Sequence, residues 1–97
     1  MVVGCLEIVV QMESADSLKE KRGVVKSLVE KTRHKFNASV AEVGQNDEHQ
    51  RSEVGVTVVG NDSSHVNSML DKILDSFEES AIGRADVIDT ELELVQY

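Results

Sequence analysis

Residues 53–77 read EVGVTVVGNDSSHVNSMLDKILDSF, and the spacing between apolar residues changes halfway along this stretch. In the first part Val54, Val56 and Val58 form one face, a period of two that predicts a β-strand over 53–59. After Gly60 the period becomes that of a helix, with apolar residues at Val66, Met69, Leu70, Ile73, Leu74 and Phe77. Asn61 or Asp62 is the expected N-cap. A strand is therefore followed directly by an amphipathic helix.

The segments on either side of this unit predict the remaining elements. Residues 2–12 alternate apolar and other side chains, which indicates a strand. Ser17-Leu18-Lys19-Glu20 then matches a capping box, in which Ser17 is the N-cap and Glu20 reaches back to it. The helix that begins there should run to about Phe36. Shorter alternating segments predict strands over 39–44 and 86–95, and the second has one apolar side made of Ile88, Thr90, Leu92 and Leu94.

The resulting order, βαββαβ, favours one architecture. Right-handed crossovers place both helices on the same face of a four-stranded antiparallel sheet with strand order 4-1-3-2. The expected fold is an α+β, ferredoxin-like sandwich, and residues 1–97 are too few to build more than one domain. The other sheet face should stay open and carry Cys5, Glu7, Val9, Gln11, Thr57, Val59, Asp89, Glu91 and Glu93.

Composition indicates an intracellular protein. Cys5 is the single cysteine and cannot form an internal disulfide, which fits a reducing compartment. The N-terminus has no basic region ahead of its apolar residues, so it does not resemble a signal peptide. No apolar run approaches the roughly 20 residues that cross a bilayer. We expect a cytoplasmic protein without a membrane partner.

Charge is distributed very unevenly. The net charge of the chain is −8, but residues 17–36 hold seven basic and two acidic residues, a net charge of +5. The remaining residues hold three basic and sixteen acidic side chains, a net charge of −13. One basic helix on an acidic body is therefore expected, and such a helix is typical of a surface that meets an anionic partner.

The bases of this helix predict an anion-binding surface. Lys19, Lys21 and Arg22 stand in its first turns, where the macrodipole disfavours cations but where an anion is well placed. At 100° per residue, Lys19, Arg22, Lys26 and Arg33 fall within roughly a 60° arc that could follow a phosphate backbone. Two alternatives remain open at this point. Nearby acids such as Glu20, or acids of the second helix, could neutralise the arc, and Lys21 points into the apolar face, where a lysine more often extends past the core edge.

No catalytic or metal site is expected. His34, His49 and His65 share no ligand spacing with Cys5. The chain has no glycine-rich phosphate loop, and the loop at 13–16, which holds phosphate in acylphosphatases of the same strand order, carries two carboxylates here. We therefore expect a non-enzymatic protein without a cofactor.

Several short stretches together resemble the bacterial YlxP-like family, a family of unknown function. They are Ser-Leu-Lys-Glu-Lys-Arg at 17–22, Phe-Asn-Ala-Ser-Val-Ala-Glu-Val-Gly at 36–44, Gln-Arg at 50–51 and Val-Gly-Asn-Asp-Ser-Ser-His-Val at 59–66. The resemblance implies a ferredoxin-like fold and no known catalytic activity. Genes of this family often stand beside those for translation initiation and ribosome maturation, which implies a role with ribosomal RNA or the small ribosomal subunit. Two departures from the family are His49, where a tryptophan is frequent, and Gly23, where a larger residue is usual.

These observations lead to two expectations about function. The first is a non-enzymatic binding module that contacts ribosomal RNA, or a ribosome-associated partner, through its basic first helix. Its candidate contact residues are Lys19, Lys21, Arg22, Lys26, Arg33 and Arg51. The alternative is a protein-interaction module that forms a homodimer through the open sheet face around Val9 and Val59, with no RNA role.

Overall fold

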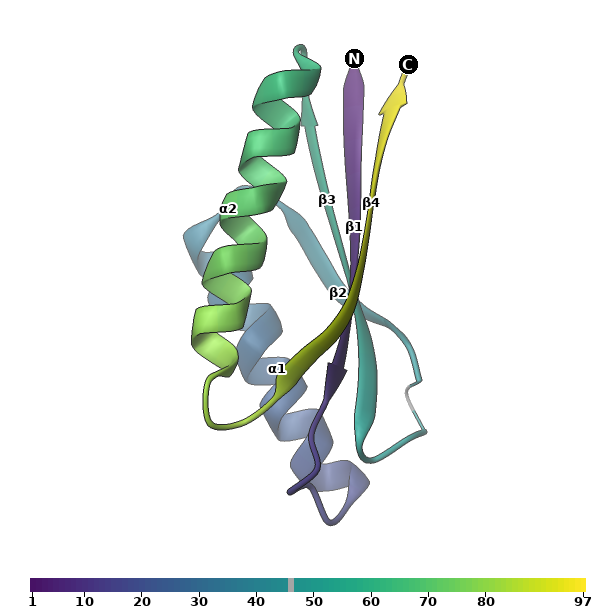
Figure 1. Ribbon diagram of the computed structural model, residues 1–97, viewed down its shortest axis with the longest axis vertical. Coiled ribbons are helices and arrows are strands. Elements are labelled where there is room, and N and C mark those ends of the chain that lie inside the picture. Colours follow the sequence, from purple (N-terminus) through teal and green to yellow (C-terminus); the bar gives the residue numbers. More distant parts are fainter. Residues whose placement is uncertain (46) are drawn as a thin grey trace.

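The computed structural model describes residues 1–45 and 47–97, and the predicted order of elements is confirmed (Figure 1). The elements are β1 (Val2–Gln11), α1 (Leu18–Lys35), β2 (Ser39–Gly44), β3 (Arg51–Gly60), α2 (Ser63–Ala81) and β4 (Asp86–Gln96). No helix among the described residues is both long enough and apolar enough to cross a membrane.

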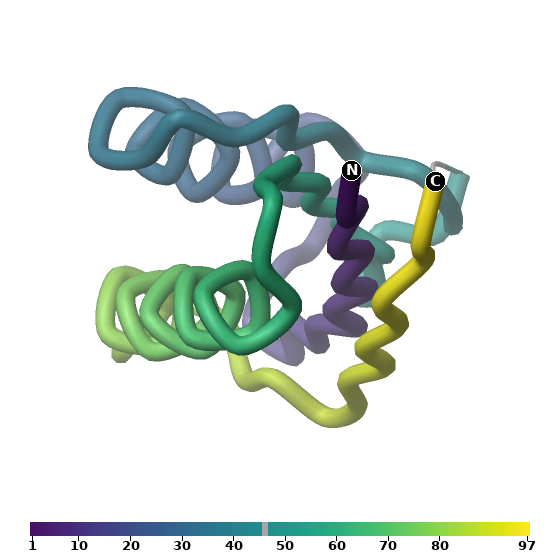
Figure 2. Tube along the Cα trace, turned by 90° about the horizontal axis from the view of Figure 1, so that it is seen from above, coloured from purple at the N-terminus to yellow at the C-terminus, as the bar shows by residue number. Residues whose placement is uncertain are grey.

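The four strands form one antiparallel sheet with the order β2-β3-β1-β4, which is the predicted order read from the other edge. The central pair is regular over its whole length, from Val2 opposite Gly60 to Gln11 opposite Arg51. Both helices lie on one side of the sheet, as the view along its strands shows (Figure 2). The fold is therefore the expected ferredoxin-like α+β sandwich, with a second sheet face that no helix covers.

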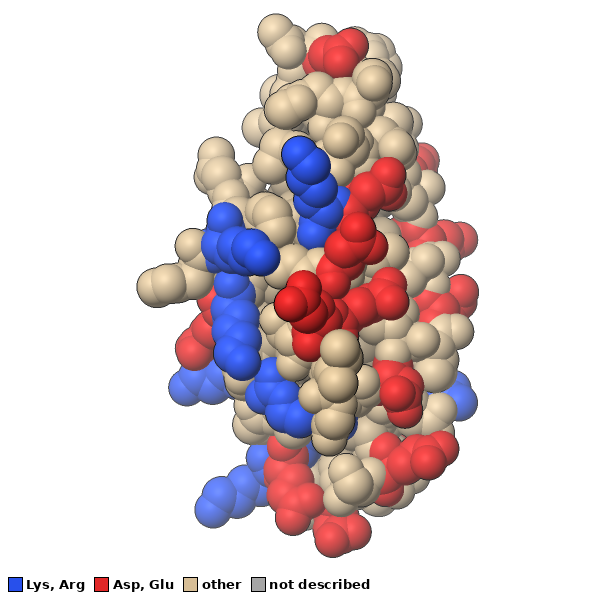
Figure 3. All heavy atoms as spheres, turned by 60° about the vertical axis from the view of Figure 1, so that its left-hand side comes forward, with Lys and Arg blue, Asp and Glu red and all other residues tan. Residues whose placement is uncertain are grey.

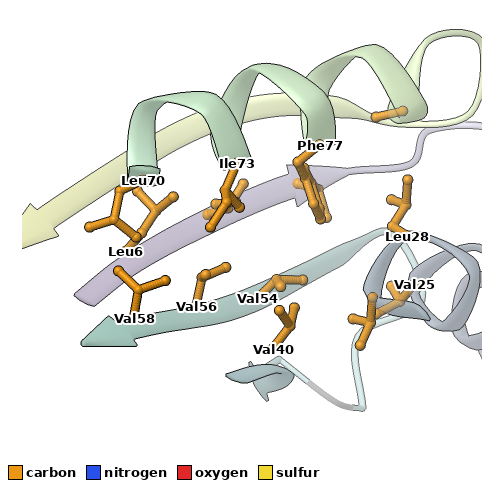
Figure 4. Close-up of a cluster of buried hydrophobic side chains, with 14 of the residues drawn as sticks. Leu6, Val25, Leu28, Val40, Val54, Val56, Val58, Leu70, Ile73 and Phe77 are labelled. Atoms are coloured by element: carbon orange, nitrogen blue, oxygen red, sulfur yellow. The ribbon is translucent and has the colours of Figure 1, made fainter. Parts of the chain in front are cut away.

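The core lies between this sheet and the two helices. Phe77, Ile73 and Leu70 point from α2 toward the strands, where they meet Leu6 and the valines of β3 (Figure 4). The side chains that α1 buries are Lys21, Val25, Leu28, Val29 and Thr32. With a single buried aromatic ring, Phe77, the core is built mainly from aliphatic side chains, as the composition predicts.

Helix α2 sits very close to β1, and Gly4 makes this approach feasible. A Cβ atom at Gly4 would lie 2.6 Å from Val66 Cγ1 and 2.7 Å from Leu70 Cδ1, both on α2. Those distances leave no room for a side chain, so glycine allows the helix to settle directly over the central strands.

Strand β4 is where the predicted burial is wrong. Its alternation correctly predicts a strand, but its apolar side chains stay at the surface, with exposed fractions of 44% at Ile88, 40% at Leu92 and 36% at Leu94. Helix α2 does contact β4, and Val87 at the start of this edge strand packs partly buried against the core. Leu92 and Leu94 lie further along the strand and stay largely exposed. A register shift opposite Val9 and Val10 further disturbs the strand near Ile88.

Both helices begin at capped N-termini. Ser17 Oγ accepts a hydrogen bond from the backbone N–H of Glu20 at 3.2 Å, as predicted for the capping box. The Glu20 carboxylate reaches back one residue further than expected and accepts from the backbone N–H of Asp16 at 2.9 Å. At α2, Asp62 is the N-cap and accepts from the backbone N–H of His65 at 3.0 Å.

Candidate functional site

Four of the predicted bases form one surface, which we call the basic flank: Lys19, Arg22, Lys26 and Arg33 of α1, all exposed. The flank is turned toward the β2 edge of the sheet, because Arg33 Nε donates a hydrogen bond to the Val40 carbonyl of β2 at 2.9 Å. The opposite flank of α1 faces α2. There Ser27 Oγ accepts from Arg84 Nη1 at 3.0 Å, and Arg84 follows directly after α2.

The acids of α2 form no ion pair with the basic flank among the described residues. Within residues 1–45 and 47–97 the ion pairs are Lys21–Glu42 and the more distant His49–Glu48, and neither involves the flank or α2. Figure 3 shows basic side chains gathered over α1 and acidic side chains over α2, in neighbouring columns on one face. All four bases of the flank are exposed. Arg33 is held at the β2 edge by its bond to the Val40 carbonyl, and Lys19, at the other end, borders a hollow that Arg84 also lines.

Lys21 does not belong to this surface, and its prediction as an anion-binding residue is wrong. Its side chain is fully buried, with an exposed fraction of 0%, and its Nζ donates to Glu42 Oε2 at 2.7 Å and to the Gln45 carbonyl at 3.2 Å. Ser52 Oγ donates to the same glutamate oxygen at 2.6 Å. Lys21 therefore ties α1 to β2 and β3 from inside the molecule.

Arg51 is also separated from the basic flank. It stands opposite Gln11 in the β1–β3 ladder, and Gln11 lies on the sheet face that the helices do not cover. Directly paired residues of an antiparallel ladder share a face. The structure thus divides the six predicted residues into four on the basic flank, one in the interior and one on the other side of the sheet.

The N-terminus of α1 is a weaker anion-binding site than its helix dipole alone would make it. The Glu20 amide is bonded to Ser17 Oγ, and the Glu20 carboxylate itself sits at this end of the helix. A phosphate there would meet a negative charge already in place. The long side chains of the basic flank, rather than the backbone amides of the tip, are what the structure presents to an anion.

The open sheet face is acidic around its apolar residues. Glu7 stands directly opposite Glu91, and Val9 lies between Glu53 and Asp89 in neighbouring strands. Val59 is 65% exposed at the end of β3. Like charges directly opposite one another are destabilising, so a partner that relieves this repulsion would be favoured over one that adds more carboxylates.

A shallow groove of about 660 Å³ runs between the two helices and is lined by Glu30, Lys31, His34, Lys35, Ser76, Glu79 and Ser80. Its walls mix both signs of charge. The three histidines lie apart in the fold: His34 on α1, His49 in the connection between β2 and β3, and His65 on α2. Over the described part of the chain, no group of three or more His, Cys, Asp and Glu side chains is placed to hold a metal ion.

Comparison with known proteins shows which family the sequence matches. The family described as "Protein of unknown function (DUF503)" matches residues 3–92. "Uncharacterized protein YlxP" of Bacillus subtilis (strain 168) is 35% identical over 81 residues, which are 80% of this chain and 88% of the relative.

Solved structures agree on the fold. A de novo designed protein with ferredoxin fold superposes with a TM-score of 0.60 at 16% identity, over 100% of this chain and 88% of the other. The Bacillus subtilis YXEP protein, a dinuclear metal binding peptidase of the M20 family, gives a TM-score of 0.55 at 18% identity, over 98% of this chain but 26% of that one. At such low sequence identities the similarity shows a shared fold and nothing about function. On the family match and the 35% identical relative, the chain belongs to the YlxP-like DUF503 family, whose function is unknown.

Proposed function

We propose that this protein is a non-enzymatic binding module that holds the phosphate backbone of RNA along the basic flank of α1. One observation carries the proposal: four exposed bases share one flank of a helix, and no acid of the described residues is ion-paired with them. Phosphate groups are the partners that several bases in a row on one helix face suit best. The genomic setting implied by the family resemblance favours ribosomal RNA, or a ribosome-associated partner, as the target.

The spacing of the flank fits an extended ligand rather than a single ion. Lys19 and Arg33 are fourteen residues apart, a distance of about 21 Å along a helix with a rise of 1.5 Å per residue. Lys26 lies midway and Arg22 one turn from Lys19. Such a line can follow several phosphates in succession, whereas a compact anion would touch one or two of the bases.

Recognition along this flank should be largely independent of base sequence. Contacts to phosphates carry no sequence information by themselves. The open sheet face, where related folds stack bases on aromatic rings, carries carboxylates on β1 and β4 instead. With a net charge of −13 outside residues 17–36, the rest of the molecule should repel RNA. A single binding orientation and a modest affinity follow.

The test replaces three flank bases by glutamine, in the variant Lys19→Gln, Arg22→Gln, Lys26→Gln. Its matched control is Lys31→Gln, Lys35→Gln, Lys72→Gln, which removes the same charge from positions off the basic flank. RNA affinity is measured by fluorescence anisotropy at several salt concentrations. The flank variant should bind much more weakly, and the slope of log affinity against log salt should fall by about 2 for three lost contacts to single strands.

The control variant separates a specific surface from general electrostatics. It should keep most of the affinity and most of the salt dependence of the parent. Equal losses in the two variants would contradict the assignment of the flank. Unchanged association of the flank variant with RNA and with ribosomes from lysate would remove the RNA proposal altogether.

A further inference from the structure

The hydrogen bonds at the chain ends reveal which backbone groups of β4 are free. Met1 and Tyr97 exchange both bonds, with Met1 N to the Tyr97 carbonyl at 2.8 Å and Tyr97 N to the Met1 carbonyl at 2.7 Å. In an antiparallel pair such bonded positions alternate with non-bonded ones. Every second residue of β4 before Tyr97 is therefore bonded to β1, and the residues between them direct their N–H and C=O groups outward: Thr90, Leu92, Leu94 and Gln96.

Of these four outward positions, Thr90 is closed and the other three are open. The outward N–H of Thr90 is already bonded to its neighbour's side chain, Asp89 Oδ1, at 2.9 Å, and the register shift lies just before it. Both features are ways in which proteins blunt a strand edge. From Leu92 to Gln96 the described residues show neither a register shift nor a side chain bonded to an outward amide. The edge of β2 differs, because Arg33 of α1 reaches over it to the Val40 carbonyl.

The side chains along the open part of the edge have two distinct characters. Leu92 and Leu94 point to the helix side of the sheet and are 40% and 36% exposed. Glu91 and Glu93 point to the open face, where Glu91 stands opposite Glu7. A strand added here would meet an apolar row on one of its sides and carboxylates on the other.

Strand β4 forms one edge of the sheet (Figure 1). We propose that this edge, from Leu92 to Gln96, binds an extended segment of a partner protein as a fifth strand, and that basic and apolar residues alternate in this segment. Its backbone bonds the outward groups of Leu92, Leu94 and Gln96. Its basic side chains lie beside Glu91 and Glu93, and its apolar side chains continue the row of Leu92 and Leu94. This is strand addition with charge as the selecting feature.

Charge argues against a second copy of this chain as the occupant. Two β4 strands related by a two-fold axis would face each other antiparallel with the same side of the sheet in common. A register centred on Leu92 sets Glu91 against Glu93 of the other copy, and one centred on Glu93 sets the two Glu93 residues against each other; like charges directly opposite are destabilising. A register centred on Leu94 sets Glu93 against Val95 and still gathers four carboxylates on one face of the joined strands. A basic segment turns the same contacts into favourable pairs.

The probe is an acetylated and amidated octapeptide of alternating lysine and valine, added to the full chain. Two control peptides are a glutamate–valine alternation and a block peptide of four lysines followed by four valines. Amide hydrogen exchange is followed by NMR. In the free protein Leu92, Leu94 and Gln96 should exchange quickly while Glu91 and Glu93 are protected. The alternating basic peptide should protect the first three, and the control peptides should not.

Protein variants test the role of charge. Glu91→Gln with Glu93→Gln should weaken the alternating basic peptide roughly two- to thirtyfold, the range expected for two cross-strand charge pairs. The matched control, Asp71→Asn with Asp75→Asn on α2, removes the same charge away from the edge and should leave the affinity nearly unchanged. Both variants keep the buried core, and their folding is checked by the same NMR spectra.

Three outcomes would overturn the proposal. Equal binding of the block peptide would show attraction by charge without strand addition. Fast exchange at Leu92, Leu94 and Gln96 under saturating alternating peptide would place the peptide elsewhere. Protection of these amides in the free protein that grows with its concentration would assign the edge to a second copy.

Discussion

The buried pair of Lys21 and Glu42 gives the sharpest prediction about stability. An ammonium group with no solvent exposure is bonded to a carboxylate whose side chain is 17% exposed, and Ser52 donates to the same carboxylate. Removing one partner of a buried ion pair typically costs about 3–5 kcal/mol of unfolding free energy, because the other charge stays behind. The two single substitutions should nevertheless differ, since the charges that they leave behind are not equally buried.

Glu42→Gln leaves the Lys21 ammonium buried without its carboxylate partner. The free energy of unfolding should therefore fall by about 3–5 kcal/mol, the range for a broken buried ion pair. Lys21→Met leaves a carboxylate that keeps its bond to Ser52 and some contact with water, so we expect about 2–3 kcal/mol, near the desolvation cost of one unpaired polar group. The double variant should cost less than the sum of the two by about 1–3 kcal/mol, as neighbours in one network do.

Urea unfolding followed by far-UV circular dichroism measures all three free energies. The control is Lys19→Met, which removes an exposed lysine two residues earlier and should change the unfolding free energy by less than about 0.5 kcal/mol. If Lys21→Met matches this control, the lysine is not the buried anchor described above. Additive effects of the two single substitutions would refute the coupling between Lys21 and Glu42.

Three further substitutions test the packing. Gly23→Ala should raise the unfolding free energy by about 1 kcal/mol, because a Cβ there meets nothing within 4 Å and glycine weakens a helix; an unchanged urea midpoint would contradict this. Gly4→Ala should lower it by about 1–3 kcal/mol through a clash with Val66 and Leu70, and a neutral result would mean that α2 moves away at little cost. Phe77→Ala should cost about 3–5 kcal/mol at a fully buried position, and an unchanged melting temperature would place Phe77 outside the core.

The period of apolar residues was sufficient to predict the fold. Val54, Val56 and Val58 alternate, Val66 to Phe77 repeat with helical spacing, and these are the residues that meet in the core. The same reasoning failed at β4, where alternation was equally clear but Leu92 and Leu94 remain exposed. Periodicity identifies a strand and its two sides. How far along a strand a helix covers its inward side depends on where the helix lies, and the period of the strand does not contain that information.

Four of the six candidate residues share one helix flank as predicted, whereas Lys21 is buried and Arg51 lies on the other side of the sheet. Helical spacing correctly grouped Lys19, Arg22, Lys26 and Arg33 and also placed Lys21 on the apolar arc. A signal for its partner was present in β2, where Glu42 shares the inward side with Val40. An inward base and an inward acid on elements that pack together predict a buried pair. The direction of the basic flank, toward β2 rather than α2, could not be predicted because it depends on tertiary packing.

The two proposed surfaces lie at opposite edges of the sheet, which makes their electrostatics separable. The basic flank overlies β2, and the acidic edge is β4, three strand spacings away. At about 4.8 Å per spacing this is roughly 14 Å across the sheet alone. The screening length at physiological salt is about 8 Å, so each field should be largely screened from the other.

Independence of the two surfaces follows from this separation and has a measurable consequence. Replacing Lys19, Arg22 and Lys26 by glutamine should leave the affinity for the alternating basic peptide nearly unchanged. Replacing Glu91 and Glu93 by glutamine should leave the affinity for RNA nearly unchanged. At low salt the screening length grows to about 30 Å at 0.01 M, and a weak coupling between the surfaces should then appear. Strong coupling at physiological salt would mean that one ligand reaches both edges, and the assignment of separate partners would be wrong.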